Sequence, residues 1–347
     1  MSLNIKRFCL TFSLIAGFML LLQSVFSQSD TATAGALLVK NQKTLGRSVA
    51  LVWKEGKIIY QKDAGVDFNG KSQAPIGASS QWLTAALVMS FVDEGKISLD
   101  DPVGKYIPIF NSYMKSYLTV RQCLMHSTGF ERDKGLLAKL TYGRKYETLE
   151  AQVNALAAKE INVNAGEEYH YGSYGPFIAA RVIEIVGKKP FERLVQERIT
   201  RPCKMRITNF NNDGNCPNPG FGAVSSANDY LNFLIMLLND GMFEGKKVLS
   251  PAAVKELLRA QLPNIPVKYK PEQVTGYDIA LGNFVEKDEA GNNKMVCSPS
   301  FTGTWPYVDL CRKYAAIIFV EQTKNEVKKD IAVEFRGLID AWLGGCK

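Results

Sequence analysis

Short apolar runs occur near the start of the chain and return near its end. Residues 49–53 and 58–60 are rich in β-branched and aromatic side chains and flank the turn sequence KEGK at 54–57, which predicts two strands joined by a tight turn. Strand-like runs recur at 277–285 and 314–320, with Gly and Asn between them. The pattern therefore predicts an antiparallel sheet to which both ends of the chain contribute.

The middle of the chain has helical spacing instead. Leu83, Leu87 and Phe91 recur at i, i+4 and i+8, which predicts a helix over 80–94 with one buried stripe. Further helices are predicted over residues 177–186, 229–239, 328–342 and from 251 onward, with serine caps at 226 and 250. Strands at both ends with helices between them predict an α+β fold, with an inserted, mainly helical lobe over roughly residues 100–270.

The beginning of the chain has the pattern of an export signal. Two basic residues precede an apolar run over 8–22, and a small-residue exit follows that ends at Ser27. An apolar run of about 15 residues is shorter than the roughly 20 that a membrane-spanning helix needs. We therefore expect cleavage near Ser27, a periplasmic or secreted protein without a membrane span, a flexible lead-in over 28–43 and one domain over 44–347.

The charge pattern and the histidine content bear on whether the protein binds nucleic acid or a metal. The 347 residues carry a net charge of +8, with 42 Lys and Arg against 34 Asp and Glu. The basic residues are scattered rather than striped, so nothing in the pattern indicates a nucleic-acid partner. No two cysteines have C-x-x-C spacing, the only histidines are His126 and His170, and the sequence predicts neither a metal site nor another cofactor.

Six of the seven cysteines follow the predicted signal. An even number in an oxidising compartment allows up to three disulfides. Cys203 with Cys216, and Cys297 with Cys311, are close enough in sequence to be plausible pairs. Buried free thiols remain the alternative for each pair.

Several segments in collinear order carry a family resemblance. They read PIGASSQWLTAA at 75–86, VDEGKISLDDPV at 92–103, LMHSTG at 124–129, GAVSSANDY at 222–230, MLLNDG at 236–241 and LSP at 249–251. These segments resemble the β-lactamase-related serine hydrolases, which include class C β-lactamases, D-alanyl-D-alanine carboxypeptidases and family VIII esterases. The resemblance implies the β-lactamase and penicillin-binding transpeptidase fold, with ligands bound between two lobes.

The first motif of that family is S-x-x-K, in which the lysine draws the proton from the attacking serine. Ala78 and Gln81 occupy these two positions here. An alanine methyl group is no nucleophile, and a neutral glutamine cannot serve as the base. Ser79 and Ser80 are alternative nucleophiles, but neither has a lysine three residues further on.

The second and third motifs are also altered. Tyr171 matches the family's tyrosine and Ser173 stands in the asparagine's place; Tyr171 would act as a base only if its pKa fell several units from about 10. The third motif resembles a serine-proline variant, and no cation is present there to bind a carboxylate. The candidate ligand-binding residues of the two motifs are Ser173, Ser298, Ser300 and Gly303.

The nucleophile, its base and the strand cation are therefore all absent from the positions where the family has them. We expect a catalytically inactive homologue that binds a small peptide, a peptidoglycan fragment or an ester-like ligand. Two alternatives stay open at this point. One is an active esterase or carboxypeptidase-like hydrolase that uses a relocated serine, and the other is an interaction or scaffold protein without catalysis.

Overall fold

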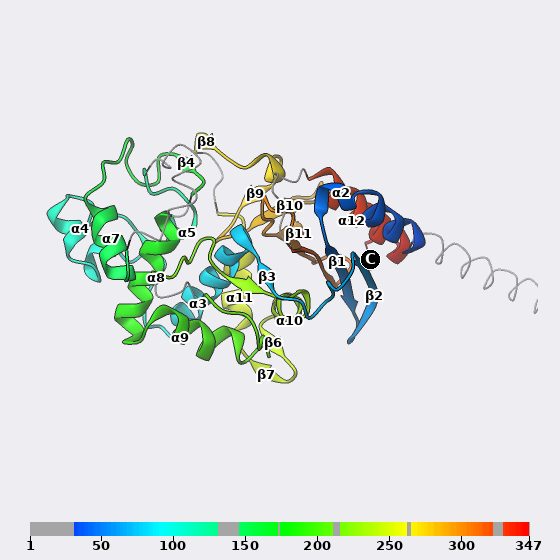
Figure 1. The fold of residues 1–347 in the computed structure, drawn as a ribbon. Helices are drawn as coiled ribbons and strands as arrows, with labels where there is room; N and C mark the ends of the chain where they lie inside the picture. The colour runs from blue at the N-terminus through cyan, green and yellow to red at the C-terminus, as the bar shows by residue number, and fades with distance from the viewer. Residues whose placement is uncertain are drawn as a thin grey trace, which may run out of the picture.

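A seven-stranded antiparallel sheet organises the computed structural model, which describes residues 31–130, 146–172, 174–210, 216–261, 265–321 and 329–346 (Figure 1). The strand order is β2-β1-β13-β12-β11-β10-β9. The strands are β1 Ser48–Lys54, β2 Lys57–Ala64, β9 Asp278–Ile279, β10 Phe284–Lys287, β11 Asn293–Cys297, β12 Trp305–Asp309 and β13 Tyr314–Val320. Strand β1 pairs with β2 on one side and with β13 on the other, which confirms that both ends of the chain build one sheet.

Side chains on β1 alternate between two hydrophobic cores. Val49 and Leu51 belong to the core that includes the helices of the middle of the chain. Ala50 and Val52 belong to the second core, on the opposite face of the sheet. This two-residue period is the geometry of an extended strand, and it explains why the sequence shows a continuous apolar run here, since both faces are covered.

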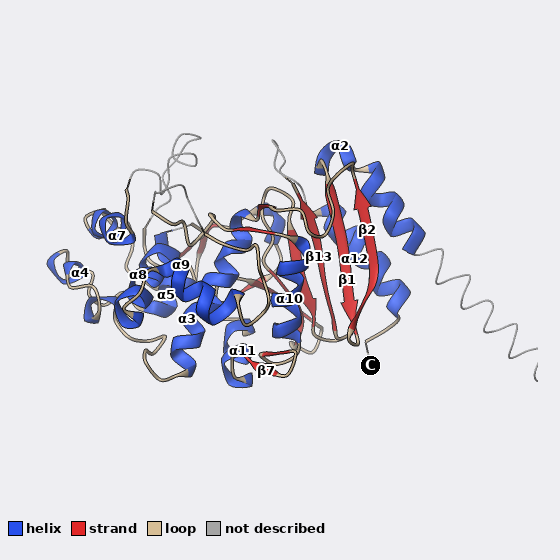
Figure 2. Ribbon diagram, turned by 60° about the horizontal axis from the view of Figure 1, so that its bottom comes forward, coloured by secondary structure: helices blue, strands red, loops and turns tan. Residues whose placement is uncertain are grey.

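Helices cover both faces of the sheet (Figure 2). Helix α12 (Asp330–Leu343), the helical residues 31–40 and α2 (Gln42–Leu45) lie on one face, and α10 (Ala227–Leu238) packs against β13 on the other. The prediction of a flexible lead-in over 28–43 is wrong for its described part. The reason is that Ala34, Leu37 and Leu38 lie on one helical side and join the same core as α12, so a segment of small and polar composition still buries an apolar stripe.

The remaining helices gather largely at the other end of the molecule (Figure 1). They are α4 Ile109–Ser112, α5 Val120–Leu124, α7 Leu149–Ala157, α8 Tyr174–Gly187, α9 Phe191–Val195 and α11 Pro251–Leu258, with single turns at Gly77–Ser79, Val103–Lys105, Gln196–Thr200 and Glu272–Val274. Three short ladders complete the fold: β3 Ala74–Pro75 with β5 Val224–Ser225, β4 Tyr169–His170 with β8 Val267–Tyr269, and β6 Met242–Phe243 with β7 Lys246–Lys247. The helices predicted from the sequence are confirmed in α3, α8, α10, α11 and α12, within a few residues at each end.

Helix α3 (Ser80–Asp93) lies in the centre of the molecule. Every residue from Ser80 to Phe91 is buried, so the prediction of one buried stripe is wrong. The helix packs against α8, α9 and α11, and the Trp82 ring meets Phe233 of α10 edge-on at 5.8 Å. A helix enclosed on all sides buries polar positions as well, and the start of α3 is where the altered first motif lies.

The cysteine pairing differs from both predicted pairs. Cys311 forms a disulfide with Cys346, with Cα atoms 5.4 Å apart, whereas Cys203, Cys216 and Cys297 are buried and form no disulfide. The predicted Cys203–Cys216 and Cys297–Cys311 pairs are therefore both wrong. Packing of α12 on the sheet brings the end of the chain to the β12–β13 turn, and sequence separation carries no information about such a tertiary contact.

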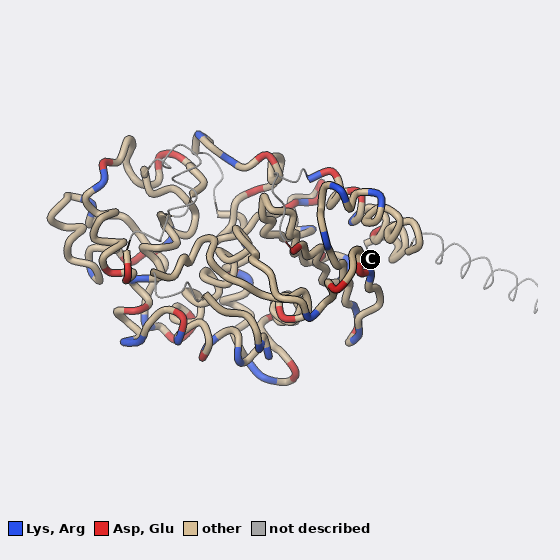
Figure 3. The backbone as a smooth tube through the Cα atoms, viewed as in Figure 1, with Lys and Arg blue, Asp and Glu red and all other residues tan. Residues whose placement is uncertain are grey.

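Charged residues are spread over the whole molecule rather than gathered in one patch (Figure 3). In the part of the chain that the structure describes, no helix has the length and apolar character needed to cross a bilayer. The same part contains no group of three His, Cys, Asp or Glu side chains placed to hold a metal ion.

Candidate functional site

Ala78 lies in the single helical turn that leads directly into α3. Its methyl group is almost completely buried, with 3% of the residue exposed. The preceding Gly77 has a φ of +51°, and a Cβ atom there would lie 2.4 Å from the Ser300 Oγ atom. The close approach that glycine permits places Ala78 beside the segment of the third motif.

Gln81 follows one helical turn later and is held by a histidine. Its Oε1 atom lies 2.9 Å from the His126 Nε2 atom, and its Nε2 atom lies 3.5 Å from the Gly172 carbonyl oxygen. Burial lowers the pKa of His126 to about 3, with a smaller contribution from His170. The imidazole is therefore neutral near pH 7, and its Nε2 atom must carry the proton because an amide oxygen only accepts.

Tyr171 completes the polar group beside Ala78. Its ring centre lies 4.6 Å from that of His126, and its backbone N–H donates to the Tyr269 carbonyl at 3.0 Å, which fixes it at the end of the β4–β8 ladder. Burial raises the pKa of the Tyr171 phenol, Tyr269 adds to this, and a hydrogen bond with Gln81 acts in the opposite direction. The phenol is consequently protonated at neutral pH. Ser173, the other predicted residue of this motif, lies outside the described residues.

The two alternative serines have their hydroxyl groups engaged in the fold. Ser79 donates to the Ser298 carbonyl at 2.6 Å, and Ser80 donates to the Gly77 carbonyl at 2.6 Å while accepting from the Ala223 N–H at 3.0 Å. Both side chains are fully buried. Each hydroxyl joins the start of α3 to a neighbouring segment.

The third-motif segment runs alongside this start of α3. Ser298 donates to the Gly282 carbonyl at 3.2 Å, and the Ser300 and Thr302 hydroxyls lie 2.8 Å apart. Gly303 has a φ of +98° and donates its N–H to the Ser300 carbonyl at 3.0 Å. The structure thus brings Ala78, Gln81, Tyr171, Ser298 and Ser300 to one place, from segments that are far apart in the sequence.

Comparison with known proteins identifies the fold and the family. Residues 36–340 match the family model described as Beta-lactamase. The chain belongs to the β-lactamase family. It is 24% identical over 270 residues to Protein Rv1367c of Mycobacterium tuberculosis, covering 61% of this chain and 67% of that protein. It is 26% identical over 176 residues to the teichoic acid D-alanine hydrolase of Staphylococcus aureus, and this match spans 49% of the chain and less than half, 42%, of that hydrolase.

Solved structures of the β-lactamase family support the same fold. A candidate β-lactamase from Bacteroides dorei superposes with a TM-score of 0.80 at 23% identity, covering 89% of this chain and 97% of that one. An octameric penicillin-binding protein homologue from Pyrococcus abyssi superposes with a TM-score of 0.73 at 19% identity, covering 89% and 77% of the two chains. These likenesses confirm the predicted α+β architecture.

His126 is the residue of this β-lactamase-family site that the sequence did not identify. The sequence places it in the LMHSTG segment that resembles the family, and this pattern alone assigns it no part in the site. Its φ of +55° is uncommon for a residue other than glycine, and that turn directs the imidazole towards Gln81. A histidine in a turn that precedes Ser-Thr-Gly was the available signal, but its contact with residue 81 depends on the tertiary fold.

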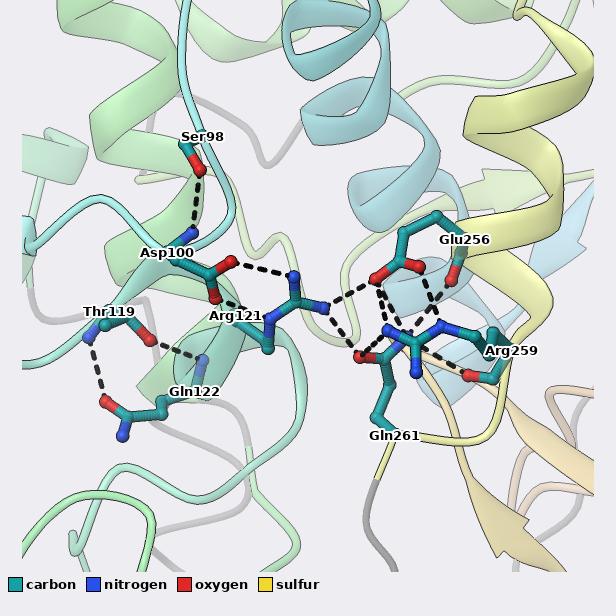
Figure 4. Close-up of polar contacts among 8 residues, drawn as sticks. All are labelled: Ser98, Asp100, Thr119, Arg121, Gln122, Glu256, Arg259 and Gln261. Atoms are coloured by element: carbon teal, nitrogen blue, oxygen red, sulfur yellow. Dashed lines mark hydrogen bonds and ion pairs between the residues drawn. The ribbon is translucent and has the colours of Figure 1, made fainter.

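An ion-pair network surrounds Arg121 on α5, the helix that precedes His126 in the chain (Figure 4). Arg121, on α5, donates to Asp100 at 2.7 Å, to Glu256 at 2.6 Å and to Gln261 at 2.7 Å. These contacts join α5 to the end of α11 and to the turn after α3. The network thus anchors α5, which leads directly into Met125 and His126.

We expect Glu256→Gln to lower the free energy of unfolding near pH 7 and to matter less in acid. Partial burial alone would raise the pKa of the Glu256 carboxyl, but hydrogen bonds from Arg259, Arg121 and Gln261 lower it to about 2. The carboxylate therefore contributes its full stabilisation above its ordinary pKa of 4.5, and this contribution is lost as the pH falls towards 2. Urea unfolding of both proteins at neutral and acidic pH measures the difference, and a gap that stays constant would contradict this assignment.

Proposed function

We propose that this member of the β-lactamase family is catalytically inactive and binds a small peptide, a peptidoglycan fragment or an ester-like ligand at the site around Ala78. The observation that carries the proposal is the Ala78 methyl group at the nucleophile position, with Gln81 held by His126 at the position of the base. The staphylococcal relative is named for hydrolysis of teichoic acid D-alanine, which supports a ligand from the cell envelope.

The physical argument concerns the missing acid–base chemistry. Acyl transfer through a serine needs an alcohol and a group that takes its proton, and the two act as a unit whose loss costs roughly 10⁴ to 10⁶ in rate. Neither Gln81 nor the neutral His126 bonded to it replaces the lysine. The pKa of the Tyr171 phenol is raised by burial, so this side chain does not take the proton near pH 7 either.

A relocated serine is disfavoured by the contacts of both candidates. Ser79 and Ser80 donate their protons to backbone carbonyls, and each would have to break a buried hydrogen bond before attacking a ligand. Breaking these bonds would also detach the start of α3 from Ser298 and from Ala223.

We also propose that the protein is exported. The basic start, apolar run and small-residue exit at the beginning of the chain support this proposal. The Cys311–Cys346 disulfide agrees with an oxidising compartment, because structural disulfides are rare in the reducing cytosol of mesophiles.

The test of inactivity is covalent labelling. Purified protein is incubated with a fluorophosphonate probe, a fluorescent penicillin and a chromogenic cephalosporin, and its intact mass is then measured. We expect no added mass and no turnover. An adduct that disappears in Ser79→Ala or Ser80→Ala would establish a relocated nucleophile and overturn the proposal.

A further inference from the structure

We infer that the ligand group seated against Ala78 is uncharged, an ester or amide carbonyl, and that the site discriminates against free carboxylates. The inference rests on the proposed function, because it names the chemical class of the ligand bound at that site. The proposed function allows both esters or amides and peptides that end in a free carboxylate. The inference selects the first class of ligand over the second.

Three described polar side chains lie around Ala78, and all three are neutral. Gln81 has no charge, and burial keeps the His126 imidazole deprotonated and the Tyr171 phenol protonated near pH 7. These three side chains contact one another and backbone groups, and their described contacts involve no Lys or Arg. A carboxylate buried among them would lose its hydration without gaining an opposite charge, which is unfavourable.

The third-motif segment supplies no charge either. The Ser298 hydroxyl donates to the Gly282 carbonyl, and the Ser300 hydroxyl bonds to that of Thr302. Lys270 is a half-buried cation on the neighbouring segment after β8, but its amine donates to the Tyr277 carbonyl and lies 5.9 Å from the centre of the Phe284 ring. Its amine thus already has a backbone carbonyl as its hydrogen-bond acceptor.

The neutral groups suit a carbonyl oxygen. The contact from the Gln81 Nε2 atom to the Gly172 carbonyl is 3.5 Å, at the long limit of a hydrogen bond, so this N–H can be redirected to a ligand oxygen at little cost. The Tyr171 phenol, being protonated, is a second donor. Two neutral donors can bind the oxygen of an ester or amide, which needs no cation to offset its burial.

The charge preference can be measured without knowing the ligand. In an Ala78→Cys variant, three methanethiosulfonates of equal length report on the site: the neutral 2-hydroxyethyl, the anionic 2-sulfonatoethyl and the cationic 2-aminoethyl reagent. The introduced thiolate attacks the reagent's sulfenyl sulfur, a mixed disulfide forms and methanesulfinate leaves. Val66→Cys, at a residue that is 78% exposed, is the matched control, and the unmodified protein reports on its buried thiols.

For each reagent, the rate of modification of the Ala78→Cys variant is divided by its rate with the Val66→Cys control. We expect this ratio to be at least about tenfold higher for the neutral reagent than for either charged reagent. The reason is that burial without a counter-charge penalises both signs. An anionic or cationic reagent that reacts as fast as the neutral one would overturn the inference, while leaving an accessible site as the proposed function requires. If no reagent modifies the thiol at position 78 until the protein is unfolded, the site is closed to ligands, and the proposed function fails together with the inference.

Discussion

The double variant Ala78→Ser with Gln81→Lys is expected to react covalently with a neutral fluorophosphonate at least about 10³-fold faster than the unmodified chain, which has no nucleophile at that position. The two positions lie three residues apart at the start of α3, so both side chains are on the same side of the helix. A lysine amine at 81 would replace the Gln81 contact with His126, whose imidazole can shift its proton and accept instead.

The buried position of residue 81 favours the reaction. Burial lowers the pKa of a lysine because it disfavours the charged form, so a larger share of the amine is free to take the serine proton. Tyr171, still protonated beside it, can then donate towards the leaving group. Fast labelling is thus expected only when both side chains are restored together.

Single variants are the controls for this experiment. Ala78→Ser alone lacks the base and Gln81→Lys alone lacks the nucleophile, so each should label at a small fraction of the double variant's rate. Peptide mass analysis must place the adduct on residue 78. A folded double variant that gains no adduct would mean that the surroundings of Ala78 no longer bind the transition state, contrary to a retained site.

The architecture was largely predictable because local signals agree with the fold. The serine caps at Ser226 and Ser250 accept hydrogen bonds from the N–H groups of Asp229 and Ala253, at the predicted starts of α10 and α11. The β1–β2 hairpin likewise follows from its turn sequence. These features depend on neighbours within a few residues, and local sequence therefore specifies them.

What could not be predicted depends on packing between distant segments. The apolar spacing on α3 indicated one stripe, but the helix is enclosed by others on all sides, and no local period encodes that enclosure. The pairing of Cys311 with Cys346 depends on where α12 docks. In the site, the positions of Ala78 and Gln81 followed from the family motif, whereas the contact with His126 joins residues 45 apart in sequence through a left-handed turn.

Gly175→Ala should destabilise the protein by about 3 kcal/mol or more, because its backbone has no space for a side chain. Gly175 is in the first turn of α8, and a Cβ atom there would lie 1.9 Å from the Cys123 carbonyl oxygen and 2.7 Å from its carbonyl carbon. Backbone atoms cannot rotate away as a side chain can, so α8 would have to move away from α5. Urea unfolding followed by tryptophan fluorescence measures the loss.

Gly337→Ala is the matched control, because it makes the same chemical change at a helical glycine where no heavy atom would lie within 4 Å of the new Cβ. Gly337 is exposed in the interior of α12, and alanine there is expected to stabilise by about 0.5 to 1 kcal/mol through its better helix propensity. The two variants should therefore shift the unfolding midpoint in opposite directions. A Gly175→Ala protein that unfolds at the same urea concentration as the unmodified chain would show that α8 can move away from α5 without cost.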